Sequence, residues 1–110
     1  MEQRIKLLVY PVTDTGKAKA FFNKFLGVEP YVDSPYYVGY KVGETEVGLD
    51  PNSKAGPVVY TDVVDIQASL IELIEAGAEI VQDIKDVGNG LRIAQVKDTD
   101  GNVLGLRQQP

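Results

Sequence analysis

The chain has 110 residues, of which 44% are hydrophobic and 25% charged, a balance that predicts one globular domain rather than a disordered segment. It contains no cysteine and no histidine, which excludes disulfide scaffolds, thiolate and imidazole metal ligands, cysteine nucleophiles and the Ser-His-Asp triad. A formal net charge of −5 argues against binding to nucleic acid or to acidic membranes. No apolar stretch approaches the roughly 18 residues of a membrane span and no secretory signal is evident, so we expect a cytoplasmic protein.

The first half of the chain predicts a strand, a helix and three further strands. An apolar strand leads to Asp14, and an amphipathic run then continues to Gly27. Asp14 is a good N-cap because its carboxylate accepts hydrogen bonds from the first free N–H groups of a helix. Gly27 stands where a left-handed residue would end that helix. Strand-like runs follow at about residues 29–33, 36–42 and 45–50.

The second half repeats this order about 50 residues later, which is the signature of an internal repeat. Asp65 precedes a second amphipathic run that ends at Gly77. Strand-like runs follow at about residues 79–86, 91–98 and 102–108, and a Gly-containing turn separates the last two. The repeat predicts two modules of the same design.

Each predicted helix has one apolar face, which we expect to pack in the core rather than to form an aromatic binding site. The members of these faces are Ala18, Phe21, Phe22 and Phe25 in the first helix and Ile66, Leu70, Leu73 and Ile74 in the second.

Together these elements predict an α+β fold of two βαβββ modules, residues 1–52 and 56–110, within a single domain, residues 1–110. The segment 51–57 is rich in Pro, Gly and Ser and is the only linker-like stretch. Neither half would bury enough core alone, so we expect both halves to form one fold.

Several short motifs occur in the same order as in a known superfamily. They are VTD with AFF and LGV in the first half, VVDI with AGA in the second, and the closing turn DTDGNVL at residues 98–104. In this order and spacing the chain resembles the vicinal oxygen chelate superfamily, which includes glyoxalase I, the extradiol dioxygenases and the bleomycin-resistance proteins. The resemblance covers nearly the whole chain. It implies that each module curls its sheet into a half-barrel and that the paired modules enclose a cleft.

Metal-dependent members of that superfamily carry a His or Gln on the first strand of each module and a Glu on each last strand. The resemblance places the first-strand positions at Leu7 and Val58, and the Glu positions at Gly48 and Gly105. None of these side chains can donate a lone pair to a metal. Glyoxalase and extradiol chemistry both require a Lewis-acid metal. We therefore expect no metal ion, no cofactor and no catalytic residue of that type.

Strand alternation in the same register predicts which side chains line the cleft. The expected ligand-binding residues are Leu7, Val9, Gly48, Asp50, Val58, Tyr60, Asp62, Gly105 and Arg107, with Tyr36 and Tyr40 from the third strand. This apolar and aromatic set is typical of a pocket for a planar or cationic organic molecule, and the two glycines would let ligand rings approach the backbone.

Each polar or aromatic member of the set also has a structural explanation. The tyrosines are good strand formers, and Asp50 lies where a solvated rim charge is common. Asp62 needs a partner if it faces inward, and Arg107 could supply one within the fold.

These observations favour a metal-free member of the superfamily that binds a small organic molecule. One alternative is an antibiotic-sequestering protein of the bleomycin-binding type. Another is a metal-independent lyase or isomerase in which burial raises the pKa of a cleft carboxylate, Asp62 or Glu46. Open strand edges and thin cleft rims predict a homodimer, and we expect neither nucleic acid nor a membrane as a partner.

Overall fold

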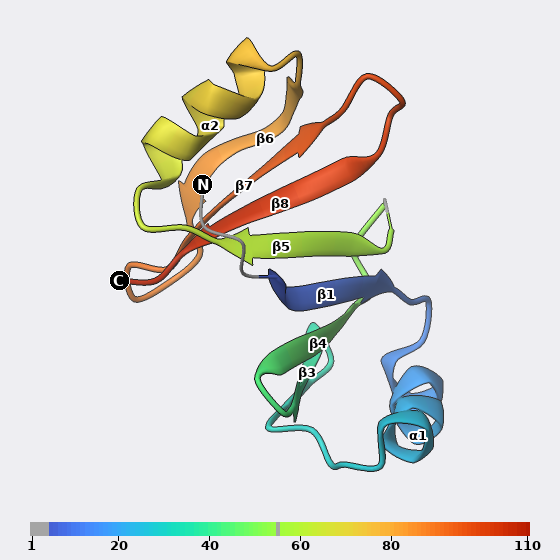
Figure 1. Ribbon diagram of the computed structural model, residues 1–110. Helices are drawn as coiled ribbons and strands as arrows, with labels where there is room; N and C mark the ends of the chain where they lie inside the picture. Colours follow the sequence, from blue (N-terminus) through green and yellow to red (C-terminus); the bar gives the residue numbers. More distant parts are fainter. Residues whose placement is uncertain (1–4, 55) are drawn as a thin grey trace. The chain divides into compact units, whose positions relative to one another are not determined.

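The computed structural model describes residues 5–54 and 56–110 and confirms a mixed α+β fold (Figure 1). The chain divides into two compact units, which we call the N-terminal unit, Lys6–Val58, and the C-terminal unit, formed mainly by Val59–Pro110. None of the helices in these described ranges has the length and apolarity needed to cross a membrane.

The N-terminal unit is a four-stranded sheet with one helix. Its elements are β1 (Ile5–Pro11), α1 (Thr15–Leu26), β2 (Val32–Ser34), β3 (Tyr37–Val42) and β4 (Thr45–Asp50). The strands lie in the order β2-β3-β4-β1, with β1 parallel to β4 and the other neighbours antiparallel. The strand expected at 29–33 is shorter than predicted and begins at Val32.

The C-terminal unit repeats this topology. Its elements are β5 (Val58–Asp62), α2 (Ile66–Glu75), β6 (Glu79–Asp86), β7 (Arg92–Lys97) and β8 (Val103–Gln108). The strands lie in the order β6-β7-β8-β5, with β5 parallel to β8 and the other neighbours antiparallel. The internal repeat in the sequence is therefore a repeat of the βαβββ topology.

Both helices begin where the aspartates predict. The Asp14 carboxylate accepts a hydrogen bond from the Lys17 backbone N–H at 3.1 Å, and Asp65 accepts one from Ala68 at the same distance. Gly27 ends α1 with a φ of 73°, a left-handed conformation that glycine adopts without a steric penalty.

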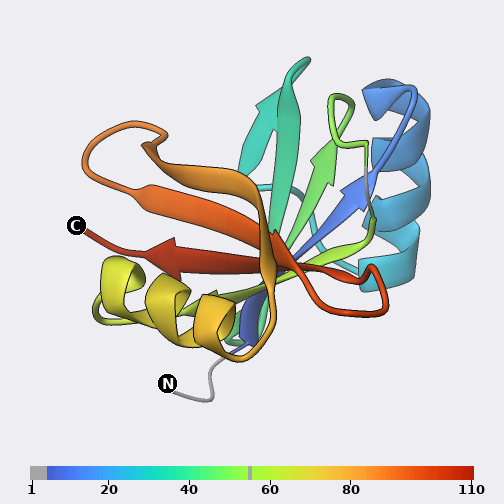
Figure 2. The same cartoon turned by 90° about the horizontal axis from the view of Figure 1, so that it is seen from above.

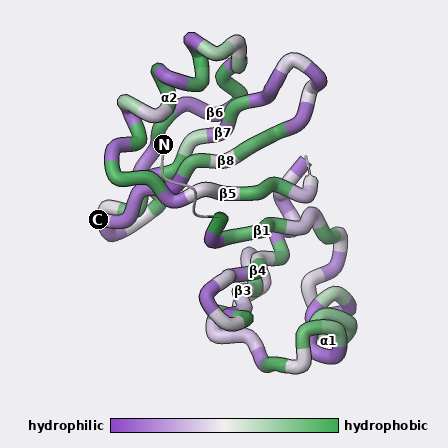
Figure 3. The backbone as a smooth tube through the Cα atoms, in the orientation of Figure 1, coloured by the Kyte–Doolittle hydropathy of each residue, from purple (hydrophilic) through white to green (hydrophobic). Residues whose placement is uncertain are grey.

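Each helix covers one face of its own sheet (Figures 1 and 2). Beneath α1 lie Val38, Tyr40, Val47 and Leu49, with Phe22 among the helix residues packed against them. A second apolar cluster lies between α2 and its sheet and includes residues of both, and Figure 3 shows hydrophobic and hydrophilic residues alternating along that helix. Its buried members are Val63, Ile66, Leu70, Ala94, Val96 and Leu106.

The helix faces differ in part from the prediction. Phe22 packs against the ring of Tyr10 with a centroid separation of 5.3 Å, as a core residue should. Phe21 and Phe25 are exposed instead, and Ile74 on α2 is exposed as well. The expectation that all three phenylalanines are core residues is wrong, because α1 presents only one narrow stripe to its sheet and Phe21 and Phe25 lie beside that stripe.

Candidate functional site

The candidate binding surfaces are two sheet faces, one in each unit. Each of them is turned away from the helix of its own unit, and we call these faces the open faces. On the N-terminal unit, Leu7 pairs with Glu46 and Val9 pairs with Gly48 across the parallel strands β1 and β4. Directly paired residues point to the same side of a sheet, and their neighbours Val47 and Leu49 lie beneath α1. The pairing therefore places Leu7, Val9, Glu46 and Gly48 on the open face, and Asp50 shares their register.

The third strand has the opposite parity to the one expected. Gly39 pairs with Gly48, so Tyr37 and Lys41 share the open face while Tyr40 points to the helix. The expectation that Tyr40 lines a ligand site is wrong. Tyr36 is also misplaced, because it lies in the turn before β3 and 75% of its surface is exposed. The strand begins at Tyr37, and a shift of one residue reverses every side chain.

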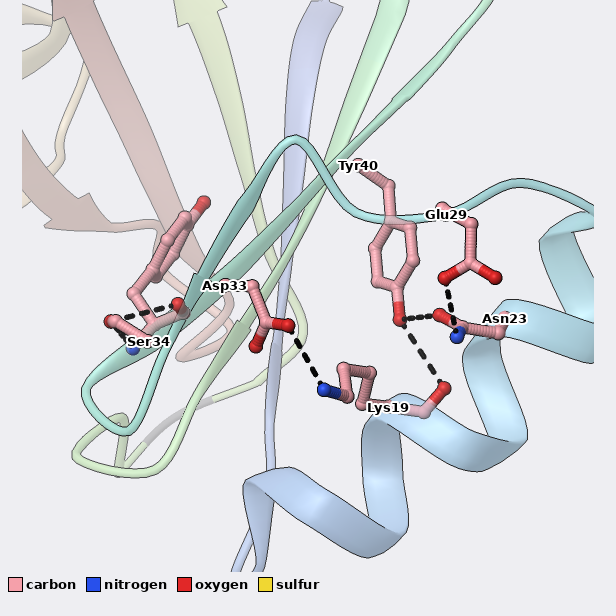
Figure 4. Close-up of polar contacts among 7 residues, drawn as sticks. Lys19, Asn23, Glu29, Asp33, Ser34 and Tyr40 are labelled. Carbon is pink, nitrogen blue, oxygen red and sulfur yellow. Dashed lines mark hydrogen bonds and ion pairs between the residues drawn. The ribbon is translucent and has the colours of Figure 1, made fainter.

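Tyr40 belongs to a polar network that joins β3 to α1 (Figure 4). Its hydroxyl donates to Asn23 Oδ1 at 2.7 Å, and Asn23 in turn donates to Glu29 at 3.1 Å. Burial raises the pKa of the Tyr40 phenol. Nearby, Lys19 donates to Asp33 at 2.9 Å, and this hydrogen bond raises the pKa of Lys19. These contacts hold α1 on its sheet and explain the burial of a tyrosine hydroxyl in the core.

The space above Gly48 is filled by the ring of Tyr37. A Cβ at position 48 would overlap the Tyr37 hydroxyl and lie only 2.6 Å from Tyr37 Cζ, closer than real Cβ contacts come. The glycine is therefore needed for the protein's own tyrosine, and the expectation that it leaves room for a ligand ring is wrong on this face.

Two further side chains of the N-terminal open face were not predicted from the sequence. The Tyr31 hydroxyl donates a hydrogen bond to the Glu46 carboxylate, and Lys41 Nζ lies 4.7 Å from the centre of the Tyr31 ring. A cation over an aromatic face is an attractive contact. In the sequence, only the alternation of Tyr37, Gly39 and Lys41 indicates which side chains of β3 share this face. It becomes informative once the start of β3 is known.

The C-terminal open face has the same design. Tyr60 on β5 pairs with Gly105 on β8, and Gln95 on β7 also pairs with Gly105. Gln95 Nε2 donates to the Tyr60 hydroxyl at 2.7 Å. A Cβ at position 105 would lie 2.7 Å from Tyr60 Cγ, and closer still to two other ring atoms. The ring of Tyr60 therefore lies against the backbone of Gly105, as the ring of Tyr37 lies against Gly48.

The inward carboxylate of Asp62 is paired with Arg107. Arg107 Nε donates to Asp62 Oδ1 at 2.6 Å and Nη2 donates to Oδ2 at 3.2 Å, a two-pronged contact. The Arg107 side chain is only 7% exposed. Ile93 pairs with Arg107 and lies on the same face. Asp62 therefore has a partner within the fold, Arg107, as its structural explanation expects.

The residues at the positions where the resemblance implies metal ligands do not fit a metal ion. Leu7 and Val58 have hydrocarbon side chains, and Gly48 and Gly105 have none. A glutamate at either glycine would require the tyrosine ring above it to move. In residues 5–54 and 56–110, no three acidic side chains come close enough together to form a metal site.

Comparison with known proteins identifies the family. The model of the Glyoxalase/Bleomycin resistance protein/Dioxygenase superfamily matches residues 4–106. The chain belongs to this superfamily. No curated protein sequence matches it significantly.

Several solved structures have the same fold. The hypothetical protein BH1468 from Bacillus halodurans C-125 is 16% identical, with a TM-score of 0.78 over 97% of this chain and 94% of that one. A superfamily member from Vibrio splendidus 12B01 is 19% identical, with a TM-score of 0.73 over 94% and 97%. A variant of Streptomyces coelicolor methylmalonyl-CoA epimerase, in complex with 2-nitronate-propionyl-CoA, is 16% identical, with a TM-score of 0.75 over 99% of both chains. At these identities the likeness concerns the fold alone.

Proposed function

We propose that this superfamily member binds a small organic molecule on its open faces without using a metal ion. The observation that carries the proposal is the placement of Tyr37 over Gly48 and of Tyr60 over Gly105. In each unit, an aromatic ring lies over the glycine at which the resemblance implies a glutamate ligand in metal-dependent members. The open faces thus offer aromatic surface and hydrogen-bonding groups in place of a Lewis acid.

The charges on these faces favour a planar molecule of low charge. Arg107 balances the carboxylate of Asp62 through two hydrogen bonds, so this carboxylate is not an isolated anion waiting for a cation. The Tyr60 hydroxyl and the Gln95 amide, joined by a hydrogen bond of 2.7 Å, add fixed polar groups to the same face. Aromatic rings with a few fixed polar groups are the usual lining of small-molecule sites.

The two alternatives from the sequence predict different ligand behaviour. Sequestration of an antibiotic is the same binding without chemistry, and a cationic drug would have to displace Arg107 from Asp62 or bind beside Glu46. A metal-independent lyase or isomerase would need a carboxylate that is free to exchange a proton. Both candidate carboxylates already accept hydrogen bonds, Asp62 from Arg107 and Glu46 from Tyr31, which favours binding over acid–base catalysis.

A thermal-shift screen tests the proposal. The library contains neutral aromatic metabolites, cationic antibiotics and divalent metals, each measured with and without a chelator. A ligand of the folded state at about 100 times its Kd adds about 2.7 kcal/mol of stability and raises the melting temperature. We expect a neutral aromatic compound to do so equally in both conditions. No hit, or a hit that requires a divalent metal, would contradict the proposal.

Adjacent tyrosines provide a matched pair of variants for the screen's hits. Tyr37→Leu removes a ring from the open face, and Tyr36→Leu removes one from the exposed turn next to it. We expect the first substitution to weaken binding by about tenfold, equivalent to about 1.4 kcal/mol, and the second to leave the affinity unchanged. Equal effects of the two substitutions would place the ligand elsewhere.

A further inference from the structure

The turn that connects β6 to β7 contains Gly88, Asn89 and Gly90. Their φ angles are all positive, at 124°, 55° and 82°, and no other non-glycine residue has a positive φ in the described part of the chain. Left-handed residues at both central positions define the tight hairpin turn for which Asn-Gly is the favoured pair. The backbone N–H of Leu91 donates to the Gly88 carbonyl at 3.0 Å and closes this turn.

The side chain of Asn89 and the amide group that follows it are not held by other groups. Asn89 is exposed, and its side-chain amide takes part in no hydrogen bond with any residue that the structure describes. Within those same residues, the backbone N–H of Gly90 donates no hydrogen bond either. Because Gly90 has no Cβ, no side chain shields its nitrogen from the Asn89 amide.

The other asparagines of the chain are more restrained; they are Asn23, Asn52 and Asn102. The Asn23 amide donates to Glu29 at 3.1 Å. The Asn102 amide donates to Asp98 at 2.9 Å. The residue after Asn52 already uses its backbone N–H, which donates to the Asp50 carbonyl at 3.4 Å. Only Asn89 therefore combines an unbonded side-chain amide with an unbonded backbone N–H in the next residue, as judged from the described ranges.

We propose that Asn89 is a site of spontaneous deamidation in the folded chain. The backbone nitrogen of Gly90 attacks Cγ of Asn89, a new Cγ–N bond forms, and the bond from Cγ to Nδ2 breaks. The proton of the Gly90 amide leaves with the Nδ2 group as ammonia, and a cyclic succinimide remains. Water then opens this ring at one of its two carbonyl carbons. One opening gives aspartate at position 89, and the other gives isoaspartate, in which the main chain runs through the former side chain.

The conformation of the turn supports this reaction. Attack requires the Asn89 side chain to rotate toward the next backbone nitrogen. Glycine stands on both sides of Asn89 and adopts either sign of φ without a steric penalty, so the local backbone can adjust. Asparagine is also one of the residues that proteins of high thermal stability tend to avoid.

Both products would alter the turn. Isoaspartate adds one atom to the main chain inside a turn that is closed by Leu91 N–H on Gly88 and by Val87 N–H on the Leu91 carbonyl at 2.8 Å. Either product also adds a carboxylate to a turn that already holds the Asp86 carboxylate, which accepts from the Gly88 N–H at 2.7 Å. Like charges at short distance repel. We expect the modified chain to be more acidic and the isoaspartate form to melt at a lower temperature.

Peptide mapping of the aged, folded chain tests the site. The purified chain is kept at neutral pH and physiological temperature for several weeks, then digested with trypsin and analysed by mass spectrometry beside a fresh sample. Cleavage after lysine and arginine places the asparagines on separate peptides, which span residues 20–24, 42–54, 86–92 and 98–107. We expect peptide 86–92 to lose its amide about tenfold faster than each of the others, equivalent to about 1.4 kcal/mol of activation free energy.

A matched pair of variants assigns the isoaspartate, which is measured by labelling with an isoaspartyl methyltransferase. Asn89→Gln should abolish the labelling of the aged chain, because the longer side chain would have to close a larger and slower-forming ring. Asn52→Gln, at another exposed asparagine, should leave the labelling unchanged. Faster loss of the amide at Asn52 or Asn102 would overturn the proposal. So would a peptide 86–92 that stays intact in the folded chain but deamidates in urea, because the turn would then protect Asn89.

Discussion

Gly105→Ala should destabilise the C-terminal unit although it adds only one methyl group. The new Cβ would lie 2.7 Å from Tyr60 Cγ and nearer still to two other ring atoms. The ring has little freedom to move, because Tyr60 is 6% exposed and its hydroxyl is bonded to Gln95 at 2.7 Å. Overpacking of a filled site costs about 1–3 kcal/mol, and loss of the hydrogen bond adds about 0.5–1.5 kcal/mol. We expect a total of about 1.5–4.5 kcal/mol.

Urea denaturation with linear extrapolation measures this loss in the free energy of unfolding. The control is a double-mutant cycle with Tyr60→Ala, which alone costs about 3–5 kcal/mol because it leaves a cavity. In the double variant the methyl group added at position 105 no longer meets the ring, so the combined loss should be smaller than the sum by about 1–3 kcal/mol. Additive losses, or a Gly105→Ala variant within about 0.5 kcal/mol of the wild type, would refute the close packing of Tyr60 on Gly105.

Three further predictions concern the polar contacts of the fold. Tyr40→Phe should lower the free energy of unfolding by about 0.5–1.5 kcal/mol. Because the pKa of Tyr40 is raised in the folded chain, the stability that its phenol contributes is complete below the ordinary pKa of 10.0 and is lost as the pH rises through the raised pKa. The urea midpoint should therefore fall at alkaline pH more for the wild type than for the variant. Arg107→Leu should cost about 2 kcal/mol, since it removes both hydrogen bonds to Asp62, and Asp62→Asn should cost less in the same denaturation assay. Asp14→Ala and Asp65→Ala should each cost about 1 kcal/mol and lower the melting temperature by similar amounts, because each removes one helix cap.

The topology of both units could be predicted from the sequence because its signals are local. An aspartate that caps a helix and a glycine that ends it act within one turn of the chain, so Asp14, Gly27 and Asp65 located both helices. The repeated order of elements then indicated the superfamily, which the family model confirms over residues 4–106.

The details of the candidate site could not be predicted in the same way because they depend on register and on packing. Because β3 begins at Tyr37, one residue later than predicted, Tyr37 lies on the open face and Tyr40 does not. The role of Gly48 changed with it, from a space for a ligand to a support for the protein's own ring. The partner of Asp62 lies 45 residues away, and only the pairing of β5 with β8 brings Arg107 into contact with it.

The width of the core face of α1 could not be predicted from the sequence either. Phenylalanines at nearby positions of an amphipathic helix predict a core face, but the width of that face depends on the sheet beneath it. Of the three phenylalanines, only Phe22 packs against the core, while Phe21 and Phe25 are exposed. Periodicity alone does not show whether neighbouring apolar residues all belong to the core face or whether some of them lie beside it.

Metal content after exposure to divalent ions tests whether the chain binds its ligand without a metal. The purified, untagged chain is incubated with zinc, nickel, manganese or magnesium salts, dialysed, and analysed for bound metal and for melting temperature with and without a chelator. Because Leu7, Gly48, Val58 and Gly105 provide no side-chain ligand atom, we expect far less than one metal per chain and no effect of the chelator. A stoichiometric metal that the chelator removes, with a loss of thermal stability or of ligand binding, would contradict this expectation.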